Sequence, residues 1–133
     1  ITFIGAAQGM LTEAIDVQKM DCDLLTFSGH KMFAPYGVGI LYGKKAFLDE
    51  LSPFQGGGSM ISQVNWESVV YQDTPHKFEA GTPNISSVLG LGEAIDFMKK
   101  YDLADWNAHE KALILHLEKE LSRYPSVTMY GPS

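Results

Sequence analysis

The stretch Leu24-Leu25-Thr26-Phe27-Ser28-Gly29-His30-Lys31 decides how the rest of this 133-residue chain is interpreted. Its first four residues carry no charge and are mostly apolar, which predicts a strand buried in a mixed or parallel sheet. Ser28-Gly29 ends the strand, so Lys31 lies just beyond it, where the chain turns. Functional groups of open α/β sheets collect at the strand ends that face the ligand crevice, and we expect Lys31 at such an end.

Lys31 by itself leaves two interpretations open. A lysine amine in this position can form a Schiff base with an aldehyde cofactor, because desolvation or a nearby charge makes it nucleophilic. The alternative is a solvated loop lysine, with His30 as a capping or surface residue. Lysines are mostly exposed, so position alone favours the alternative.

Further elements are expected on both sides of this stretch. Pro35 and Gly37 mark a loop that leads into the next strand. The segment 52–75 is rich in Gly, Ser and Pro, and long segments of this kind tend to be functional. The remaining pattern predicts strands over 1–4, 38–42 and 127–130, a turn over 16–18 and a short helix over 44–51.

Two helices are expected in the last third of the chain. Asn84 is a good N-cap for the first, and Asp102 is a candidate cap for the second, which is expected over 103–123. The first helix has apolar residues at helical spacing at Val88, Leu91, Ile95 and Met98. The second has an apolar stripe at Leu113, Leu117, Leu121 and Tyr124. That stripe fits an interdomain helix or ordinary core packing.

Composition narrows the class of protein. Hydrophobic residues make up 45% of the chain and charged residues 20%, ordinary values for a soluble chain that buries a core. The net charge of -6 argues against nucleic acid or an anionic membrane as partner. No apolar run approaches the roughly 18 residues of a membrane helix, and no signal-peptide pattern opens the chain. Cys22 is the single cysteine, so no intramolecular disulfide forms and a reducing cytoplasm is expected.

Several motifs carry a resemblance to one family. The segments are Asp16-Val17-Gln18, Asp21-Cys22-Asp23, Ser28-Gly29-His30-Lys31, Pro35, Gly37-Val38-Gly39 and Leu41-Tyr42. In this order they resemble the class V, fold type I pyridoxal-phosphate enzymes, and more narrowly the cysteine desulfurases and selenocysteine lyases. Two further segments resemble the group II, SufS-like branch: Gly56-Gly57-Gly58-Ser59-Met60-Ile61 and Phe78-Glu79-Ala80-Gly81-Thr82-Pro83-Asn84. The resemblance covers essentially the whole chain.

The resemblance implies an α/β fold in an internal fragment of a longer chain. Residues 1–100 would be the second half of the large pyridoxal-phosphate-binding domain of fold type I, with a mostly parallel sheet. Residues 101–133 would be the linking helix and the first strand of the small α+β C-terminal domain.

The resemblance also assigns roles to residues near the turn. Lys31 would be the catalytic residue that holds pyridoxal 5'-phosphate as a Schiff base and then transfers protons as general base and acid. Ser28 and His30 resemble the phosphate ligands of the family. Gln8 resembles the glutamine that hydrogen-bonds the phenolic oxygen of the cofactor, and Ala7 would pack on the pyridine ring. Judged singly, Ser28 would be a capping hydroxyl and Gln8 a surface amide.

Two more positions point to a homodimer. Gly56 and Thr82 resemble residues that reach across the interface of family dimers toward the phosphate of the neighbouring subunit. The alternative for Gly56-Gly57-Gly58 is a flexible loop in which the glycines permit positive φ angles. No histidine spacing indicates a metal site, and Cys22 does not match the persulfide-forming cysteine of the family, so it is expected to be structural.

One departure from the family pattern bears on the chemistry. The family has an aspartate whose carboxylate pairs with the protonated pyridine nitrogen, and this chain has Gly5 in that place. Loss of a hydrogen bond to a charged group costs about 1.5–3 kcal/mol and weakens carbanion stabilisation. Ala34 and Tyr36, where glycine and threonine are usual, are smaller departures.

Two functions are therefore expected. The first is that of a parent cysteine desulfurase or selenocysteine lyase, which takes sulfur from L-cysteine or acts on L-selenocysteine. It would leave L-alanine and an enzyme persulfide for a sulfur-acceptor protein of iron-sulfur cluster assembly. The second is a non-catalytic fragment or degenerate homologue with a role in folding or self-association, which Gly5 favours. Another class V enzyme, such as an aminotransferase acting on a different amino acid, is a weaker third option.

Overall fold

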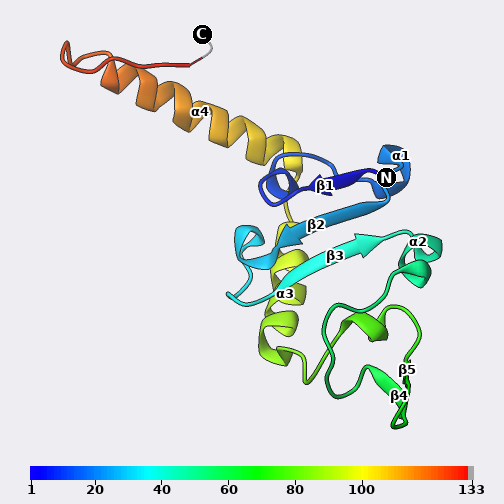
Figure 1. The fold of residues 1–133 in the computed structure, drawn as a ribbon. Helices are drawn as coiled ribbons and strands as arrows, with labels where there is room; N and C mark the ends of the chain where they lie inside the picture. Colours follow the sequence, from blue (N-terminus) through cyan, green and yellow to red (C-terminus); the bar gives the residue numbers. More distant parts are fainter. Residues whose placement is uncertain (132–133) are drawn as a thin grey trace.

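Strand β2 (Leu24–Ser28) is the central strand of the main sheet in the computed structural model, which describes residues 1–131 (Figure 1). It pairs in parallel with β1 (Phe3–Gly5) and antiparallel with β3 (Gly39–Gly43). The strands expected over 1–4, 24–27 and 38–42 are thus confirmed, with small shifts at their ends. The sheet is mixed, which is one of the two arrangements that the uncharged β2 predicted, and one of its two strand pairs is parallel.

The parallel pairing of β1 and β2 places their carboxyl ends at one edge of the sheet. A 3-10 turn follows each strand there, η1 (Gly9–Leu11) after β1 and η2 (Gly29–Met32) after β2, and the two turns contact each other. Lys31 lies in η2, on the short connection to β3 that the sequence predicted.

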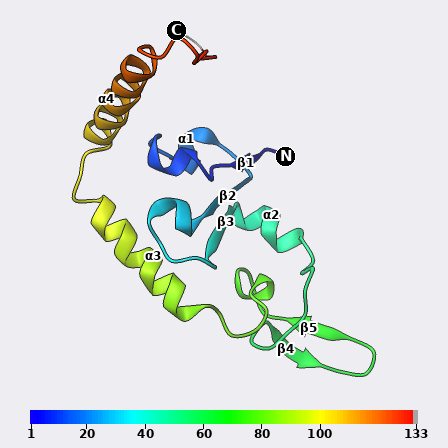
Figure 2. The same ribbon diagram turned by 90° about the vertical axis from the view of Figure 1, so that its left-hand side faces the viewer.

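Two small apolar clusters hold these elements together. Ala6, Cys22 and Leu25 form the first, beside β1 and β2. The second joins the loop after η2 to helix α3 (Ile85–Met98), through Ala34, Leu91 and Ala94. Figure 2 shows α3 running along one side of the sheet. Cys22 is fully buried, in keeping with its expected structural role.

Ion pairs join the segments at the edge of the sheet that lies opposite the lysine turn. Lys44 Nζ lies 2.8 Å from Asp21 Oδ1 and 3.0 Å from Asp23 Oδ1. Asp23 also accepts a hydrogen bond from the backbone N–H of Thr2. The Thr2 N–H, with the help of Lys44, holds the pKa of Asp23 below its usual value. These contacts fix where β2 begins and where β3 ends.

The two short helices flank this edge. Residues 16–18, expected as a turn, instead begin helix α1 (Val17–Met20), because the Asp16 carboxylate accepts the N–H groups of Gln18 and Lys19 and caps a helix. The short helix expected over 44–51 is confirmed as α2 (Lys45–Glu50).

Both long helices are confirmed with their caps. Asn84 Oδ1 accepts the N–H of Ser87 at 3.3 Å at the start of α3. Asp102 Oδ1 accepts the N–H of Ala104 at 2.8 Å at the start of α4 (Leu103–Leu121). None of the helices in residues 1–131 combines the length and apolar character needed to cross a bilayer.

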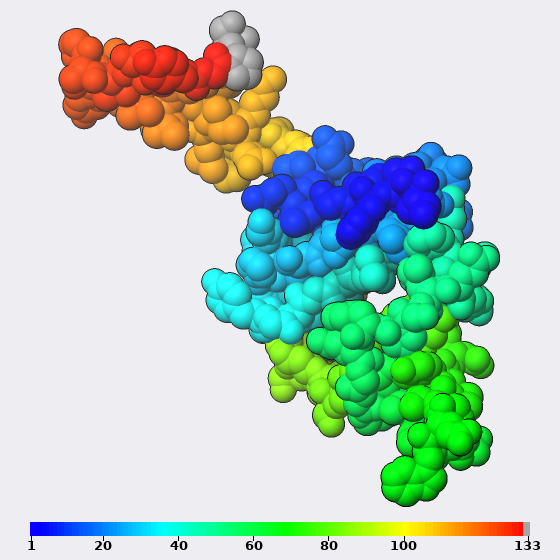
Figure 3. Space-filling view, viewed as in Figure 1, coloured from blue at the N-terminus to red at the C-terminus, as the bar shows by residue number. Residues whose placement is uncertain are grey.

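The apolar stripe of α4 does not pack in a core of the described residues. Leu113 and Leu117 are 56% and 57% exposed, and α4 has no buried residue. The helix extends from the body of the molecule as an arm (Figure 3). The described residues therefore contain no core against which this stripe packs.

Two other expectations are corrected. The segment 52–75 contains a hairpin, β4 (Ile61–Val64) and β5 (Val69–Tyr71), closed by a hydrogen bond from Asn65 N to Ser68 O. Its short strands were hidden by the Gly and Ser residues around them. Residues 127–130 are not a strand, because no described strand lies beside them to supply a hydrogen-bond ladder. Residues 132–133, the end of the expected small-domain segment, lie outside the described residues.

Candidate functional site

The lysine turn presents an ammonium group that is not used to hold the fold. Lys31 is half-buried in η2. The ammonium groups of Lys44 and Lys45 each pair with a carboxylate, whereas that of Lys31 pairs with none in residues 1–131. Its amine is thus available to a ligand at the sheet edge.

The turn itself depends on a close approach of backbone at Gly29. Its N–H donates to the carbonyl oxygen of Val38 at 2.9 Å. A Cβ added at Gly29 would lie 2.6 Å from Val38 Cγ1, closer than real atoms come. Any larger residue at position 29 would clash with Val38, so glycine is required between Ser28 and His30.

Ser28 and His30 flank this glycine. Ser28 is the N-cap residue of η2, but its hydroxyl makes no capping hydrogen bond, so the capping interpretation is not supported. His30 is exposed, and its ring centroid lies 5.3 Å from that of Tyr36 at an interplanar angle of 31°. Tyr36, a minor departure from the family pattern, thus contacts a candidate phosphate ligand.

Ala7 and Gln8 reach the same edge from β1. The N–H of Ala6 donates to Thr26 O at 2.8 Å and keeps the end of β1 beside β2. Gln8 is exposed and precedes η1, where it lines a groove of about 1080 Å³. The walls of this groove are mostly apolar and come from η1, Phe33 and the facing ends of α3 and α4.

An aromatic cluster that the sequence did not indicate supports the groove. Phe33, directly after η2, has a left-handed φ of 64°. Its ring lies 5.3 Å from that of Trp106 and 6.5 Å from that of Phe97, and Tyr101 contacts both of these rings. Asn107 adds a hydrogen bond to Thr12 O at 3.0 Å. The start of α4 thus touches the segments that follow both β1 and β2.

Gly56 and Thr82 form a separate group. Their segments are joined by a hydrogen bond from Gly81 N to Gly58 O at 2.8 Å. No described contact joins either residue to Ser28, His30 or Lys31, and both are exposed. The sequence-derived site residues therefore divide into one set at the sheet edge and one at the base of the hairpin.

The donor set at the sheet edge fits a phosphorylated aldehyde in part. Lys31 offers an amine for the aldehyde, and Ser28 and His30 offer a hydroxyl and an imidazole for a phosphate. A carboxylate for a protonated ring nitrogen is missing at Gly5. The space for one exists, because no heavy atom lies within 4 Å of a Cβ added at Gly5.

The fold defines an α/β domain whose candidate functional groups gather where a parallel strand pair ends. The chain belongs to the aminotransferase class-V family, whose profile matches residues 1–133. A cysteine desulfurase of Pectobacterium atrosepticum is 40% identical over 134 residues, which cover 100% of this chain and 33% of that protein. The chain thus spans about a third of the length of such relatives. The resemblance to class V enzymes and cysteine desulfurases is confirmed.

Solved structures confirm the expected fold class. The cysteine desulfurase CsdA of Escherichia coli, in an S-sulfonic acid form, superposes with a TM-score of 0.88 at 38% identity, over 94% of this chain and 31% of that one. The apo cysteine desulfurase of Thermococcus onnurineus also gives a TM-score of 0.88, at 33% identity, over 99% of this chain and 33% of that one.

Proposed function

We propose that this chain is part of a pyridoxal-phosphate-dependent cysteine desulfurase or selenocysteine lyase. The intact protein takes sulfur from L-cysteine, or selenium from L-selenocysteine, and leaves L-alanine. The observation that carries the proposal is that Gln8 follows β1 while Ser28, His30 and Lys31 lie at the end of β2, so all four are at the carboxyl ends of two parallel strands. The turns η1 and η2 that follow these strands contact each other, and Gln8 also lines an apolar groove. Cysteine desulfurase relatives support the reaction class.

Each residue has a distinct task in this proposal. Lys31 anchors the cofactor's aldehyde carbon and moves protons to and from the substrate. Ser28 and His30 hold the phosphate, Gln8 hydrogen-bonds the phenolic oxygen, and the small side chain of Ala7 lets the ring approach. When bound, the cofactor would supply an electron sink for the negative charge that develops at the amino acid's α-carbon when its proton is removed, which prepares the bond between the β-carbon and sulfur or selenium for cleavage.

The proposal extends to partners and domains. Gly56 and Thr82 serve the phosphate site of the neighbouring subunit in a homodimer, which agrees with their separation from Lys31 in one chain. A cytoplasmic sulfur-acceptor protein of iron-sulfur cluster assembly receives the product sulfur. Residues 1–100 belong to the large domain, and residues 101–133 lead into the small one. This boundary falls between the end of α3 and the start of α4.

One observation favours the alternative of a non-catalytic homologue. Gly5 leaves the pyridine nitrogen without its ion-pair partner, and this lowers the power of the cofactor as an electron sink. A protein of this kind retains the fold and its self-association without turnover.

The test is a spectroscopic titration of the intact protein with pyridoxal 5'-phosphate. Lys31→Ala abolishes the visible absorbance band of the lysine-bound cofactor and also turnover, because it removes the amine that holds the cofactor. Lys19→Ala is the matched control, since Lys19 is an exposed lysine of the same domain whose ammonium pairs with Asp16. It leaves the band intact.

Two results would contradict the proposal. A wild-type protein that shows no band has no cofactor site, and a band that survives Lys31→Ala places the anchor elsewhere. Alanine release from L-cysteine and from L-selenocysteine then measures substrate preference. A protein that binds the cofactor but releases no alanine from either is the non-catalytic homologue or a class V enzyme of another specificity.

A further inference from the structure

The segments that carry Gly56 and Thr82 form one structural unit, which we call the double loop and define as residues 56–60 and 72–82. Two backbone hydrogen bonds join its segments: Gly81 N donates to Gly58 O, and Gln72 N donates to Met60 O, both at 2.8 Å. A Cβ added at Gly57 would lie 3.2 Å from Ala80 Cβ, so the two segments are in close contact. Met60, at the end of the first segment, is fully buried.

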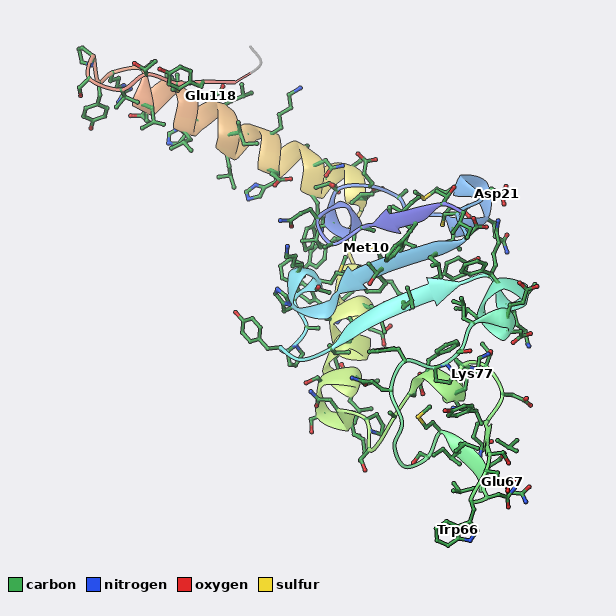
Figure 4. The ribbon with its side chains drawn as sticks, viewed as in Figure 1. Met10, Asp21, Trp66, Glu67, Lys77 and Glu118 are labelled. Carbon is green, nitrogen blue, oxygen red and sulfur yellow. The ribbon has the colours of Figure 1, made fainter. Side chains whose placement is uncertain are left out.

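Lys77 fastens this unit to the sheet domain. It lies in η3 (His76–Phe78), and Figure 4 shows it between α2 and the hairpin, with Trp66 at the hairpin's far tip. Its Nζ donates to the backbone oxygens of Asp49 at 2.9 Å and of Leu51 at 2.8 Å. The ammonium also lies 5.0 Å from the centroid of the Phe78 ring, which limits its movement.

The acceptors of Lys77 are well suited to a cation. Both carbonyl groups lie at the C-terminal end of α2, where unpaired carbonyls carry partial negative charge. The Asp49 carboxylate lies at the same helix end and is ion-paired with Lys45, whose hydrogen bond holds its pKa below the usual value. Helix α2 follows β3 directly, and β3 pairs with β2, which leads into the lysine turn.

We propose that Lys77 is a positioning residue for cofactor phosphate. By holding the double loop against the end of α2, it sets the direction in which Gly56 and Thr82 face the phosphate of the neighbouring subunit. The inference rests on the proposed function, since it presupposes a homodimer that binds pyridoxal 5'-phosphate. It adds a residue that touches neither the cofactor nor the substrate.

The test compares two probes that differ only in the phosphate group. The dissociation constants of pyridoxal 5'-phosphate and of unphosphorylated pyridoxal are measured by absorbance titration of the intact protein. Lys77→Met keeps most of the side-chain stem but removes the charged donor, and it weakens binding of the phosphorylated form about tenfold. Affinity for pyridoxal stays unchanged. Lys77→Arg, which keeps charge and donors, restores the wild-type ratio.

The control is Lys19→Met. Lys19 lies on α1, and its Nζ pairs with Asp16 Oδ2 at 3.5 Å. This variant removes a surface lysine that neither proposal uses and leaves the ratio of the two affinities at the wild-type value. Lys77→Gln is a second, milder variant for use if Lys77→Met does not fold.

The outcomes separate the two levels of proposal. A wild-type protein that binds neither probe overturns the proposed function, and the role of Lys77 with it. A wild-type protein that binds both, with Lys77 variants that weaken both equally or neither, overturns the role of Lys77 alone. A shift with Lys77→Arg as large as with Lys77→Met also overturns it, because the charged tether would then be irrelevant.

Discussion

At the scale of single residues, the candidate site combines groups that agree with the family pattern and one that does not. Lys31 has no carboxylate partner in residues 1–131, and the Ser28 hydroxyl makes no hydrogen bond that caps η2. Both are therefore available to a ligand. Gly5 lies on the neighbouring strand, at the position opposite Thr26, and offers only backbone. Gly5 is therefore the position at which this chain departs from the family pattern by lacking a side chain.

Gly5→Asp tests this directly. The variant folds as the wild type does, because the space around an added Cβ is open and Gly5 is exposed. Affinity of the intact protein for pyridoxal 5'-phosphate rises roughly tenfold to a hundredfold if the new carboxylate gains a hydrogen bond to the charged ring nitrogen. Absorbance titration of both proteins measures the change. Unaltered affinity and spectrum would show that the missing carboxylate is irrelevant here.

At the scale of elements, α3 supports the loop that closes the lysine turn. Asn84 Nδ2 donates to Gly37 O at 3.3 Å, and Ser87 Oγ donates to Tyr36 O at 2.9 Å. Further along the helix, Pro35 packs directly on Gly90. One helix face therefore holds three successive loop residues, and the loop in turn fixes where η2 ends.

A pair of glycines on α3 tests this contact. Gly90→Ala destabilises the chain by about 1–3 kcal/mol, because the new Cβ would lie 2.6 Å from Pro35 Cγ and Cδ and overpack the contact. Gly92→Ala, two residues along in open space, is neutral or stabilises by up to about 1 kcal/mol through helix propensity. Denaturant unfolding measures both. Equal effects would mean that the loop does not rest on α3.

At the scale of the whole molecule, the chain exposes more surface than its size predicts. Its accessible surface is 10260 Å². A compact monomer of 14.7 kDa has about 7,000 Å². The excess lies where α4 extends as an arm and where the hairpin projects on the other side (Figures 1 and 3). These surfaces agree with the proposal that further parts of a longer, dimeric protein cover them.

Helix α4 is accordingly expected to be less protected than α3 in the 133-residue chain. It has 19 residues, none of them buried, and helices in proteins owe most of their stability to the packing of an apolar face. Helix α3 is the internal control, since Leu91 and Ala94 are buried. Hydrogen exchange should show faster exchange over residues 110–121 than over 88–98. Comparable protection of the two segments would contradict this prediction.

The sequence by itself determined the three strands of the main sheet, the capped long helices and the family. Those features rest on local signals: an uncharged strand, carboxylate and amide caps, and motifs in a fixed order. It also predicted which residues follow the strands, and hence that Lys31 lies on a turn. The turn predicted over 16–18 was wrong because an aspartate is typical both of a turn and of a helix cap. The strand predicted over 127–130 was wrong because a strand needs a hydrogen-bonding partner, which local sequence does not reveal.

Only the tertiary structure decided which groups meet. The parallel pairing of β1 and β2 brought Gln8 to the edge of the sheet that carries Lys31. Gly56 and Thr82 lie apart from this edge, on the double loop. The left-handed Phe33 against Trp106, and Lys77 on the end of α2, are contacts between residues far apart in the chain. No local pattern encodes such contacts, because side-chain packing and the geometry of unpaired carbonyls arise only once the elements are assembled.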